Sequence, residues 1–327
     1  MLLNSISFAN VDQNIETSLQ NKIITYYDED DSIVRIVRTY PDNKSRKLGY
    51  NKTISYFGPN EVMEKQDKFY TDSYSQKTGV KKTTTHYSLD GKKDRIEKFY
   101  TERTSKASGV EKAVNYPSDS SKNGKISKEE RFSSNEAFEK TGEYKRIKYL
   151  DPVGKKLKEE VFYAKDKETP DQYYRVIFHY DKYETLVKKE TFYPDKDTNE
   201  LGYYRSVFWY GFKGNKIKEE WYLTSNVVNK GQIEKQIYLY NTEGTITAQE
   251  SYFTETYAEK NGIDKAVFYF DATGRKRREE KFFSSKILEE KGWFKQVIKY
   301  DRYGFMTSEE IMDKNKKKLA IREEAIP

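Results

Sequence analysis

The sequence predicts an all-β protein, an elongated antiparallel β-meander of about ten tandem two-strand repeats that form one curved or superhelical sheet. An acidic residue recurs every 30 residues, with one step of 33, and a large apolar side chain follows two positions later. The chain also holds 29 Tyr and 18 Phe, whose rings suit a thin sheet better than a thick globular core. The recurring acids are Asp67, Glu97, Glu130, Glu160, Glu190, Glu220, Glu250, Glu280 and Glu310.

One repeat, beginning at Tyr210, indicates the order of its elements. Residues 211–214 read as a tight turn, 215–223 as a strand, 224–230 as a loop that ends at Gly231, and 232–240 as a second strand. Other tight turns carry Asp, which caps its own backbone, and Gly, which supplies a positive φ. A second glycine row, interrupted by Gln172, predicts a left-handed position before each second strand: Gly49, Gly79, Gly109, Gly142, Gly202, Gly231, Gly262 and Gly292.

The row of acids favours a meander over a parallel β-helix. In a β-helix, equivalent carboxylates would stack about 4.8 Å apart, which is the spacing of neighbouring strands. A column of like charges at that distance is destabilising. In a meander, an intervening strand doubles the separation.

A four-residue tight turn would predict the register of each hairpin. Tyr210 would then face Asn215, and Arg205 would face Glu220. Cross-strand pairs of opposite charge or of two rings each contribute about 0.2–1 kcal/mol. The predicted ladder pairs Arg175 with Glu190, Arg205 with Glu220, Lys235 with Glu250, Lys265 with Glu280, and Lys295 with Glu310; the predicted aromatic row pairs Tyr173 with Phe192, Tyr203 with Tyr222, and Trp293 with Met312.

Three segments are expected along the chain. Residues 1–22 form an N-terminal segment, 23–312 the repeat array, and 313–327 a polar tail or a cap that folds back. Within 1–9, Leu2, Leu3 and Ile6 precede Ser7-Phe8-Ala9, which is compatible with the stump of an export signal or with an ordinary frayed end.

Composition excludes several classes of function. The chain has no cysteine, so disulfides, thiolate metal sites and cysteine nucleophiles are excluded. No apolar run approaches the ~20 residues that span a bilayer. The net charge of +7 arises from 60 basic and 53 acidic residues that are interleaved, a pattern typical of a solvated surface rather than a nucleic-acid footprint.

The string Gly154-Lys155-Lys156-Leu157-Lys158-Glu159-Glu160-Val161-Phe162-Tyr163 resembles MORN-type and MORN-like β-hairpin repeats. The Tyr-Asp-x-x-Gly turn, as at Tyr300-Asp301, is similar to the YD repeats of RHS-type surface and toxin proteins. The units here are longer than is usual in those families, by a loop of about eight residues. The resemblance implies a curved antiparallel sheet used as a scaffold, shell or binding surface, without a reaction.

One segment fits the calcium loop of an EF-hand, with oxygen-bearing residues at loop positions 1, 3, 5 and 9, Gly at 6 and Glu at 12. It coincides with the three-residue insertion, whereas its lysines oppose a cation, and Glu130 also belongs to the acid row. The candidate calcium residues are Asp119, Ser121, Asn123, Lys125, Ser127 and Glu130. No other cofactor is expected.

Catalytic constellations are missing from the sequence. His86 and His179 lie three repeats apart and read as surface strand residues, and Glu159 and Glu160 point to opposite faces of a strand. No phosphate loop, nucleophile elbow or metal-hydrolase motif is found. We therefore expect a non-enzymatic scaffold or binding module, secreted or in the cell envelope.

Its ligand would be a protein or a glycan, met by ring-stacking side chains drawn from Tyr173, Phe192, Tyr203, Tyr222 and Trp293. A self-assembling structural protein is the alternative, because an open meander exposes strand edges that a second copy can pair with. Nucleic-acid or polyanion binding is a further alternative.

Overall fold

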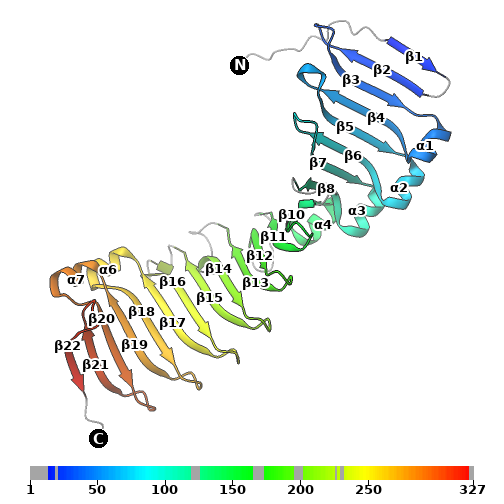
Figure 1. The fold of residues 1–327 in the computed structure, drawn as a ribbon. Helices are drawn as coiled ribbons and strands as arrows, with labels where there is room; N and C mark the ends of the chain where they lie inside the picture. Colours follow the sequence, from blue (N-terminus) through cyan, green and yellow to red (C-terminus); the bar gives the residue numbers. More distant parts are fainter. Residues whose placement is uncertain are drawn as a thin grey trace. The chain divides into compact units, whose positions relative to one another are not determined.

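The computed structural model describes residues 14–18, 21–118, 126–164, 173–194, 202–224, 227–228 and 232–323. The chain divides into two compact units, Met1–Ala164 and Lys165–Pro327. Each unit is an antiparallel meander in which every strand pairs with the next one along the chain (Figure 1). The predicted all-β meander is confirmed.

In the first unit, each of the ten neighbouring strand pairs is antiparallel. Its strands are β1 (Asn14–Ser18), β2 (Asn21–Tyr27), β3 (Ile33–Thr39), β4 (Tyr50–Phe57), β5 (Met63–Tyr70), β6 (Val80–Tyr87), β7 (Lys93–Tyr100), β8 (Val110–Pro117), β9 (Ile126–Ser133), β10 (Glu143–Leu150) and β11 (Lys156–Tyr163).

The second unit repeats this arrangement. Its strands are β12 (Arg175–Tyr180), β13 (Leu186–Phe192), β14 (Tyr203–Tyr210), β15 (Lys216–Leu223), β16 (Ile233–Tyr240), β17 (Ile246–Phe253), β18 (Ile263–Phe270), β19 (Lys276–Phe283), β20 (Lys295–Tyr300), β21 (Met306–Met312) and β22 (Lys318–Glu323). Because β1 and β22 belong to the sheet, the array extends beyond the predicted limits of 23 and 312.

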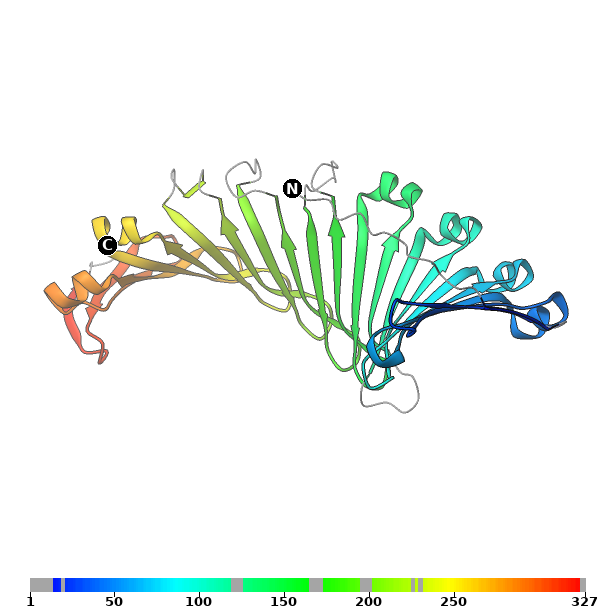
Figure 2. The same cartoon turned by 90° about the horizontal axis from the view of Figure 1, so that it is seen from above.

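Short helices replace many of the loops that the sequence predicts between repeats. They are α1 (Asp42–Leu48), α2 (Asp72–Thr78), α3 (Glu102–Ser108), α4 (Asn135–Thr141), α6 (Glu255–Asn261) and α7 (Ser285–Lys291), and a 3-10 turn, η1 (Pro59–Glu61), lies before β5. In the first unit, α1 to α4 follow one edge of the sheet, as Figures 1 and 2 show.

A capping hydroxyl at the start and a glycine at the end explain why α2, α3, α4 and α6 are helical, whereas α1 and α7 end in glycine but have no side-chain cap. The Thr71 hydroxyl accepts a hydrogen bond from the Tyr74 amide at 3.3 Å, a cap that helix N-termini require. Gly79 ends α2 with φ +74°, a left-handed conformation that favours glycine. The expected left-handed conformation is confirmed for Gly49, Gly79, Gly109, Gly142, Gly202, Gly262 and Gly292, and all of these except Gly202 are the C-cap of a described helix.

A left-handed residue also occurs next to the predicted Gly231. Gln232 has a positive φ of 57°, and its carbonyl accepts a hydrogen bond from the Thr254 amide at 3.0 Å. The 30-residue step from Gly202 to Gly262 also leads to position 232. Gly231 and Gln172 lie outside the described residues.

A backbone hydrogen bond links successive repeats at the helix edge. The amide of each helix cap donates to the carbonyl of the left-handed residue one repeat earlier, as Thr101 does to Gly79 at 2.8 Å and Ser284 to Gly262 at 2.9 Å. A side chain of the next helix then lies against the glycine: a Cβ placed on Gly262 would meet Ile287 at 2.5 Å. The helices thus stack along this edge because glycine leaves room for the next one.

The tight turns are longer than predicted, and this changes the register of every hairpin that was paired by sequence. Five residues, not four, close the turn, and the Gly211 amide donates to the Asn215 carbonyl at 2.8 Å. A bulge also shifts the pairing between Tyr210 and Trp209, next to the turn. The longer turn and the bulge each shift the pairing by one residue, so Arg205 lies opposite Tyr222, and Glu220 lies opposite Val207. The predicted facing of Arg205 and Glu220 is wrong by two residues.

The other four predicted charge rungs differ in the same way. A shift of two residues keeps the charged side chains on their expected face, because strands alternate with period two, whereas the Tyr203 pairing is shifted by one residue. The observed partners are Phe192 for Arg175, Tyr252 for Lys235, Phe282 for Lys265, and Met312 for Lys295; Tyr203 lies opposite Leu223, not Tyr222.

The two faces of the sheet are packed differently. We define face 1 as the side that carries Glu220 and its equivalents, and face 2 as the side that carries Glu219 and Trp221. Helices stack on face 2, where the ring of Tyr74 in α2 lies 4.6 Å from Tyr70 in β5, and Tyr257 in α6 lies 4.6 Å from Phe253 in β17.

Candidate binding surface on face 1

Face 1 is built from three rows that run across the strands. Row A alternates a cation with a ring, row B alternates an aliphatic side chain with an acid, and row C again alternates a ring with a cation. In one repeat, Arg205 and Tyr222 belong to row A, Val207 and Glu220 to row B, and Trp209 and Lys218 to row C. The rows arise because side chains two residues apart share a face of a strand.

Several acids in row B are buried between cations from two rows, as Glu190 shows. Glu190 is 7% exposed, and its carboxylate accepts hydrogen bonds from Lys188 at 2.8 Å, Arg205 at 2.6 Å and His179 at 3.0 Å. Burial opposes ionisation of this carboxyl, but the bonds from Lys188 and Arg205 outweigh burial and lower its pKa to about 2. Glu190 is therefore charged at neutral pH.

The charge ladder exists, but it joins strands across the helix edge instead of across the tight turn. Seven cations of row A pair with the acid 15 residues before them, not 15 after them. The observed pairs are Lys82–Asp67, Lys112–Glu97, Lys145–Glu130, Arg205–Glu190, Lys235–Glu220, Lys265–Glu250 and Lys295–Glu280, with N···O distances from 2.6 to 3.3 Å.

Five cations of row A also lie between two rings, namely Lys82, Lys112, Arg205, Lys235 and Lys265. The guanidinium carbon of Arg205 is 5.4 Å from the ring centroid of Phe192 and 4.9 Å from that of Tyr222. Lys235 lies in the same way between Tyr222 at 5.0 Å and Tyr252 at 5.5 Å. Such contacts each contribute about 0.5–1 kcal/mol at exposed sites. Row A is thus held together by cation–π contacts along its length.

A double-mutant cycle tests the observed register. We expect Arg205→Ala and Glu190→Ala to show a coupling free energy of about 1 kcal/mol in urea unfolding, because their charged groups are in contact. Arg205→Ala and Glu220→Ala should couple more weakly, since Glu220 pairs with Lys218 and Lys235. A larger coupling between Arg205 and Glu220 would contradict the register.

The two histidines occupy equivalent places in row C, which the sequence analysis missed. His86 lies 3.2 Å from Glu97, and His179 lies 3.0 Å from Glu190, both through Nε2. Burial, with Arg95 next to it, lowers the pKa of His86. The signal was present in the sequence, because each histidine stands 11 residues before a row B acid.

Cations outnumber acids on face 1 of the first unit. From β2 to β11, rows A and C hold ten cations, whereas row B holds four acids, an excess of six charges. The cations are Lys22, Arg35, Lys52, Lys65, Lys82, Arg95, Lys112, Lys128, Lys145 and Lys158, and the acids are Asp67, Glu97, Glu130 and Glu160. Charges that are interleaved in the sequence are therefore segregated by the sheet.

Near β3, three cations of face 1 form no ion pair with a described acid, because the row B acid nearest to them, Asp67, pairs with Lys82. Row B is aliphatic there, because Val37 of β3 takes the place of the acid and lies opposite Ile54. Arg35 stacks on Tyr26 with its guanidinium carbon 3.8 Å from the ring centroid, Lys65 lies 4.4 Å from Tyr56, and Lys52 lies 5.7 Å from Phe69. Among the described residues, no ion pair neutralises these three cations.

The predicted aromatic residues do not form one surface. Phe192 and Tyr222 lie on face 1 in row A, where Tyr174 and Tyr204 are their ring neighbours. Tyr203 instead contacts Trp221 on face 2 at 4.4 Å, because a bulge between Tyr203 and Arg205 reverses the alternation. Trp293 likewise contacts Phe283 at 5.7 Å, and Tyr173 lies just before β12.

The calcium loop is only partly visible. Asp119, Ser121, Asn123 and Lys125 lie outside the described residues. The Ser127 hydroxyl donates to the Tyr116 carbonyl at 3.3 Å, and Glu130 binds Lys128 at 2.5 Å and Lys145 at 2.8 Å. The calcium site stays a prediction.

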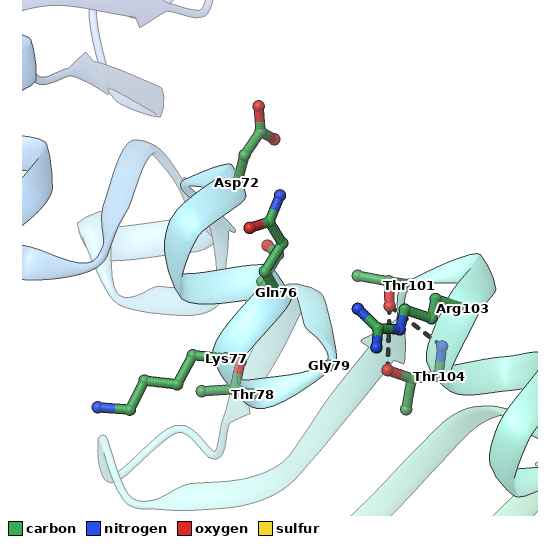
Figure 3. Close-up of a pocket in the computed structure, with 9 residues that line it drawn as sticks. Asp72, Gln76, Lys77, Thr78, Gly79, Thr101, Arg103 and Thr104 are labelled. Atoms are coloured by element: carbon green, nitrogen blue, oxygen red, sulfur yellow. Dashed lines mark hydrogen bonds between the residues drawn. The ribbon is translucent and has the colours of Figure 1, made fainter.

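An open cleft of about 490 Å³ lies between α2 and α3. Figure 3 shows that Lys77 extends away from Thr101 and Thr104, whose hydroxyls bond to each other at 3.0 Å as part of the helix cap. The polar groups therefore cap the helix and do not converge on a ligand position. Elsewhere in the described chain, no three His, Asp or Glu side chains gather closely enough to hold a metal ion.

The helices described here have seven residues each, and none of them is long and apolar enough to cross a membrane.

Comparisons with known proteins identify no family. No protein-family model matches the chain, and no curated protein matches it. Among solved structures, 90% of the chain aligns with 15% of TcdB2-TccC3-TEV at 12% identity and a TM-score of 0.16. It also aligns over 92% of both chains with a porin-like protein from Bacteroides uniformis, at 10% identity and a TM-score of 0.20. The chain thus spans about a sixth of the TcdB2-TccC3 protein, and TM-scores this low carry no functional conclusion.

Proposed function

We propose that this chain is a non-enzymatic repeat module that binds an acidic polysaccharide along face 1, at the cell envelope or outside the cell. The observation that carries the proposal is the excess of cations on face 1 of the first unit, where Arg35, Lys52 and Lys65 lie on rings without an acid partner. Cations held on aromatic faces and left without a counter-charge favour an anionic ligand.

The spacing of the cations favours a polysaccharide over a nucleic acid. Equivalent cations recur on every second strand, about 9–10 Å apart. Duplex DNA presents a phosphate every ~3.4 Å along each strand, which is far denser. An acidic polysaccharide repeats its charge pattern once per disaccharide, a longer period than one nucleotide, and the half-exposed rings of rows A and C suit its sugar faces.

Heparin serves as the probe for this proposal. We expect the chain to bind heparin–agarose, and the variant Arg35→Gln/Lys52→Gln/Lys65→Gln to elute at lower salt. Because three cations are lost, the slope of log K against log salt should fall by about two to three. No ion pair is broken in this variant, so its fold should be retained, which circular dichroism checks.

The matched control removes the same charge from face 2 of the same unit. Lys68→Gln/Lys98→Gln/Lys148→Gln should change heparin elution much less, since these residues lie on the opposite side of β5, β7 and β10. Equal effects of the two variants would contradict binding by face 1. If duplex DNA bound more tightly than heparin, the proposal that the ligand is a polysaccharide would be contradicted.

Self-assembly is the second candidate. In the described sheet, β1 pairs only with β2, and β22 pairs only with β21, so each offers an edge for another strand. Sedimentation velocity across a wide concentration range tests this: growing species support assembly, and a constant monomer contradicts it. The proposed calcium site at 119–130 is tested separately by calcium titration calorimetry.

A further inference from the structure

A cationic cleft lies at the tight-turn edge of the second unit, separate from face 1. The turns at 271–275 and 301–305 are neighbours, because β19 and β20 pair directly. Between them is a cleft of about 480 Å³. Its lining consists of Arg275, Lys276, Tyr300, Arg302, Tyr303 and Gly304, with three cations and no acid.

The two guanidiniums are positioned by the turns themselves. Arg275 Nη1 donates to the carbonyl oxygen of Arg302 at 3.1 Å, which fixes the first guanidinium against the neighbouring turn. The guanidinium carbon of Arg302 lies 4.7 Å from the ring centroid of Tyr303. Four of the five N–H groups of Arg275 remain available, and a guanidinium presents its donors in a fork that matches an oxyanion.

Nearby acids are already engaged. One oxygen of Asp271 accepts the amide of Thr273 at 2.9 Å, and its other oxygen pairs with Arg277 at 3.0 Å. Asp301 accepts the amides of Tyr303 at 2.8 Å and Phe305 at 2.9 Å. No ion pair joins Arg275 or Arg302 to any residue that the structure describes.

The third cation has a different role. Lys276 donates to Glu279 at 2.8 Å and to the Tyr300 hydroxyl at 3.1 Å, so its charge is neutralised by the protein. It separates the Glu279 carboxylate from the cleft. An incoming anion would therefore meet the two arginines first.

The arrangement is specific to this pair of turns in the second unit. The positions equivalent to Arg275 and Arg302 hold Thr245 and Ala272 in the preceding pair of turns. Further back, they hold Asn215 and Thr242, then Thr185 and Phe212. Only the last pair brings two guanidiniums together, so the cleft does not follow from the repeat pattern.

We infer that this cleft binds the phosphate or sulfate group of a monoester, carried by a sugar or by a lipid. Arg275 and Arg302 donate to the oxyanion, and charge-assisted bonds of this kind are about twice as strong as neutral ones. Tyr303 is 69% exposed and offers its ring to the carrier. The chemistry of the group is shared by the two carriers.

The test uses the full chain and inorganic phosphate. Phosphate is titrated against sodium chloride at constant ionic strength, and the Nε–Hε signals of the arginines and the amides of Tyr303 and Gly304 are followed by NMR. We expect saturable shifts at Arg275, Arg302 and both amides. In Arg275→Gln/Arg302→Gln, the affinity read from the two amides should fall at least roughly tenfold.

Lys213→Gln is the matched control, because Lys213 is an exposed cation at another tight turn of the same unit. It should leave phosphate binding unchanged. Shifts that do not saturate, or that persist in the double arginine variant, would overturn the site.

Two further arms identify the carrier. Glucose 6-phosphate supplies a soluble monoester, and vesicles with phosphatidic acid supply a lipid one. Binding of either that is lost in the double arginine variant supports the inference and names the source. If free phosphate binds but neither glucose 6-phosphate nor the vesicles do, the inference that the cleft binds a monoester is wrong. Heparin binding by face 1 is tested with variants of the first unit, and phosphate binding by the cleft with variants of the second. Either proposal can therefore fail without the other.

Discussion

Lowering the pH from about 5 to about 2 is expected to unfold the sheet, because the row B acids lose their charge in this range. Burial opposes ionisation of Glu190, but its bonds to Lys188 and Arg205 hold its pKa at about 2, against an ordinary value of 4.5. The folded-state pKa is the lower one. The stabilisation is therefore present above about pH 4.5 and is lost as the pH falls towards 2.

The expected size of the effect follows from the number of acids involved. A pKa lowered from 4.5 to about 2 corresponds to about 2–3 kcal/mol for Glu190 alone. The pKa values of five other row B acids are also lowered: Glu97, Glu130, Glu220, Glu250 and Glu310. Several such contributions are comparable to the total stability of a typical domain.

Urea unfolding, followed by far-ultraviolet circular dichroism at each pH, measures this loss. Glu190→Gln is the control: it should be less stable at pH 7, and its stability should depend less on pH between about 4.5 and 2. Stability that stays constant or rises on acidification would contradict the role of the acid row.

Replacing Gly262 by valine is expected to destabilise the second unit by about 3 kcal/mol or more. Gly262 ends α6 with φ +74°, which is costly for any side chain and most of all for a β-branched one. In addition, a Cβ at this position would lie 2.5 Å from Cγ1 of Ile287 in α7. The helices of neighbouring repeats could then no longer stack as they do.

Gly274 provides the matched control. It has nearly the same φ, +78°, but a Cβ there would meet no atom within 4 Å. Gly274→Val should therefore lose only the free energy of unfolding that a side chain at positive φ costs, about 1–2 kcal/mol. The difference between the two variants in thermal or urea unfolding measures the close approach of the helices. Equal losses would show that the stacking contributes nothing.

The sequence determined the repeat, its two-strand composition and the chemistry of its turns, because these depend on local residues. The period of the acids predicted the meander, and Asp301 and Gly304 predicted a capped turn with a positive φ. The helices were also readable: Thr71 and Gly79 stand at the start and end of α2. They were missed because seven residues are too few for an apolar periodicity to show.

The tertiary structure alone decided which residues meet. A fifth turn residue and a bulge moved Arg205 from Glu220 to a position beside Glu190, and no local pattern reveals a bulge. Pairing also gathered cations from separate strands onto face 1, so that the rows of face 1 in the first unit carry an excess of cations although the charges are interleaved in the sequence. Which charges share a surface is set by register and strand order, and these depend on contacts between residues that are distant in sequence.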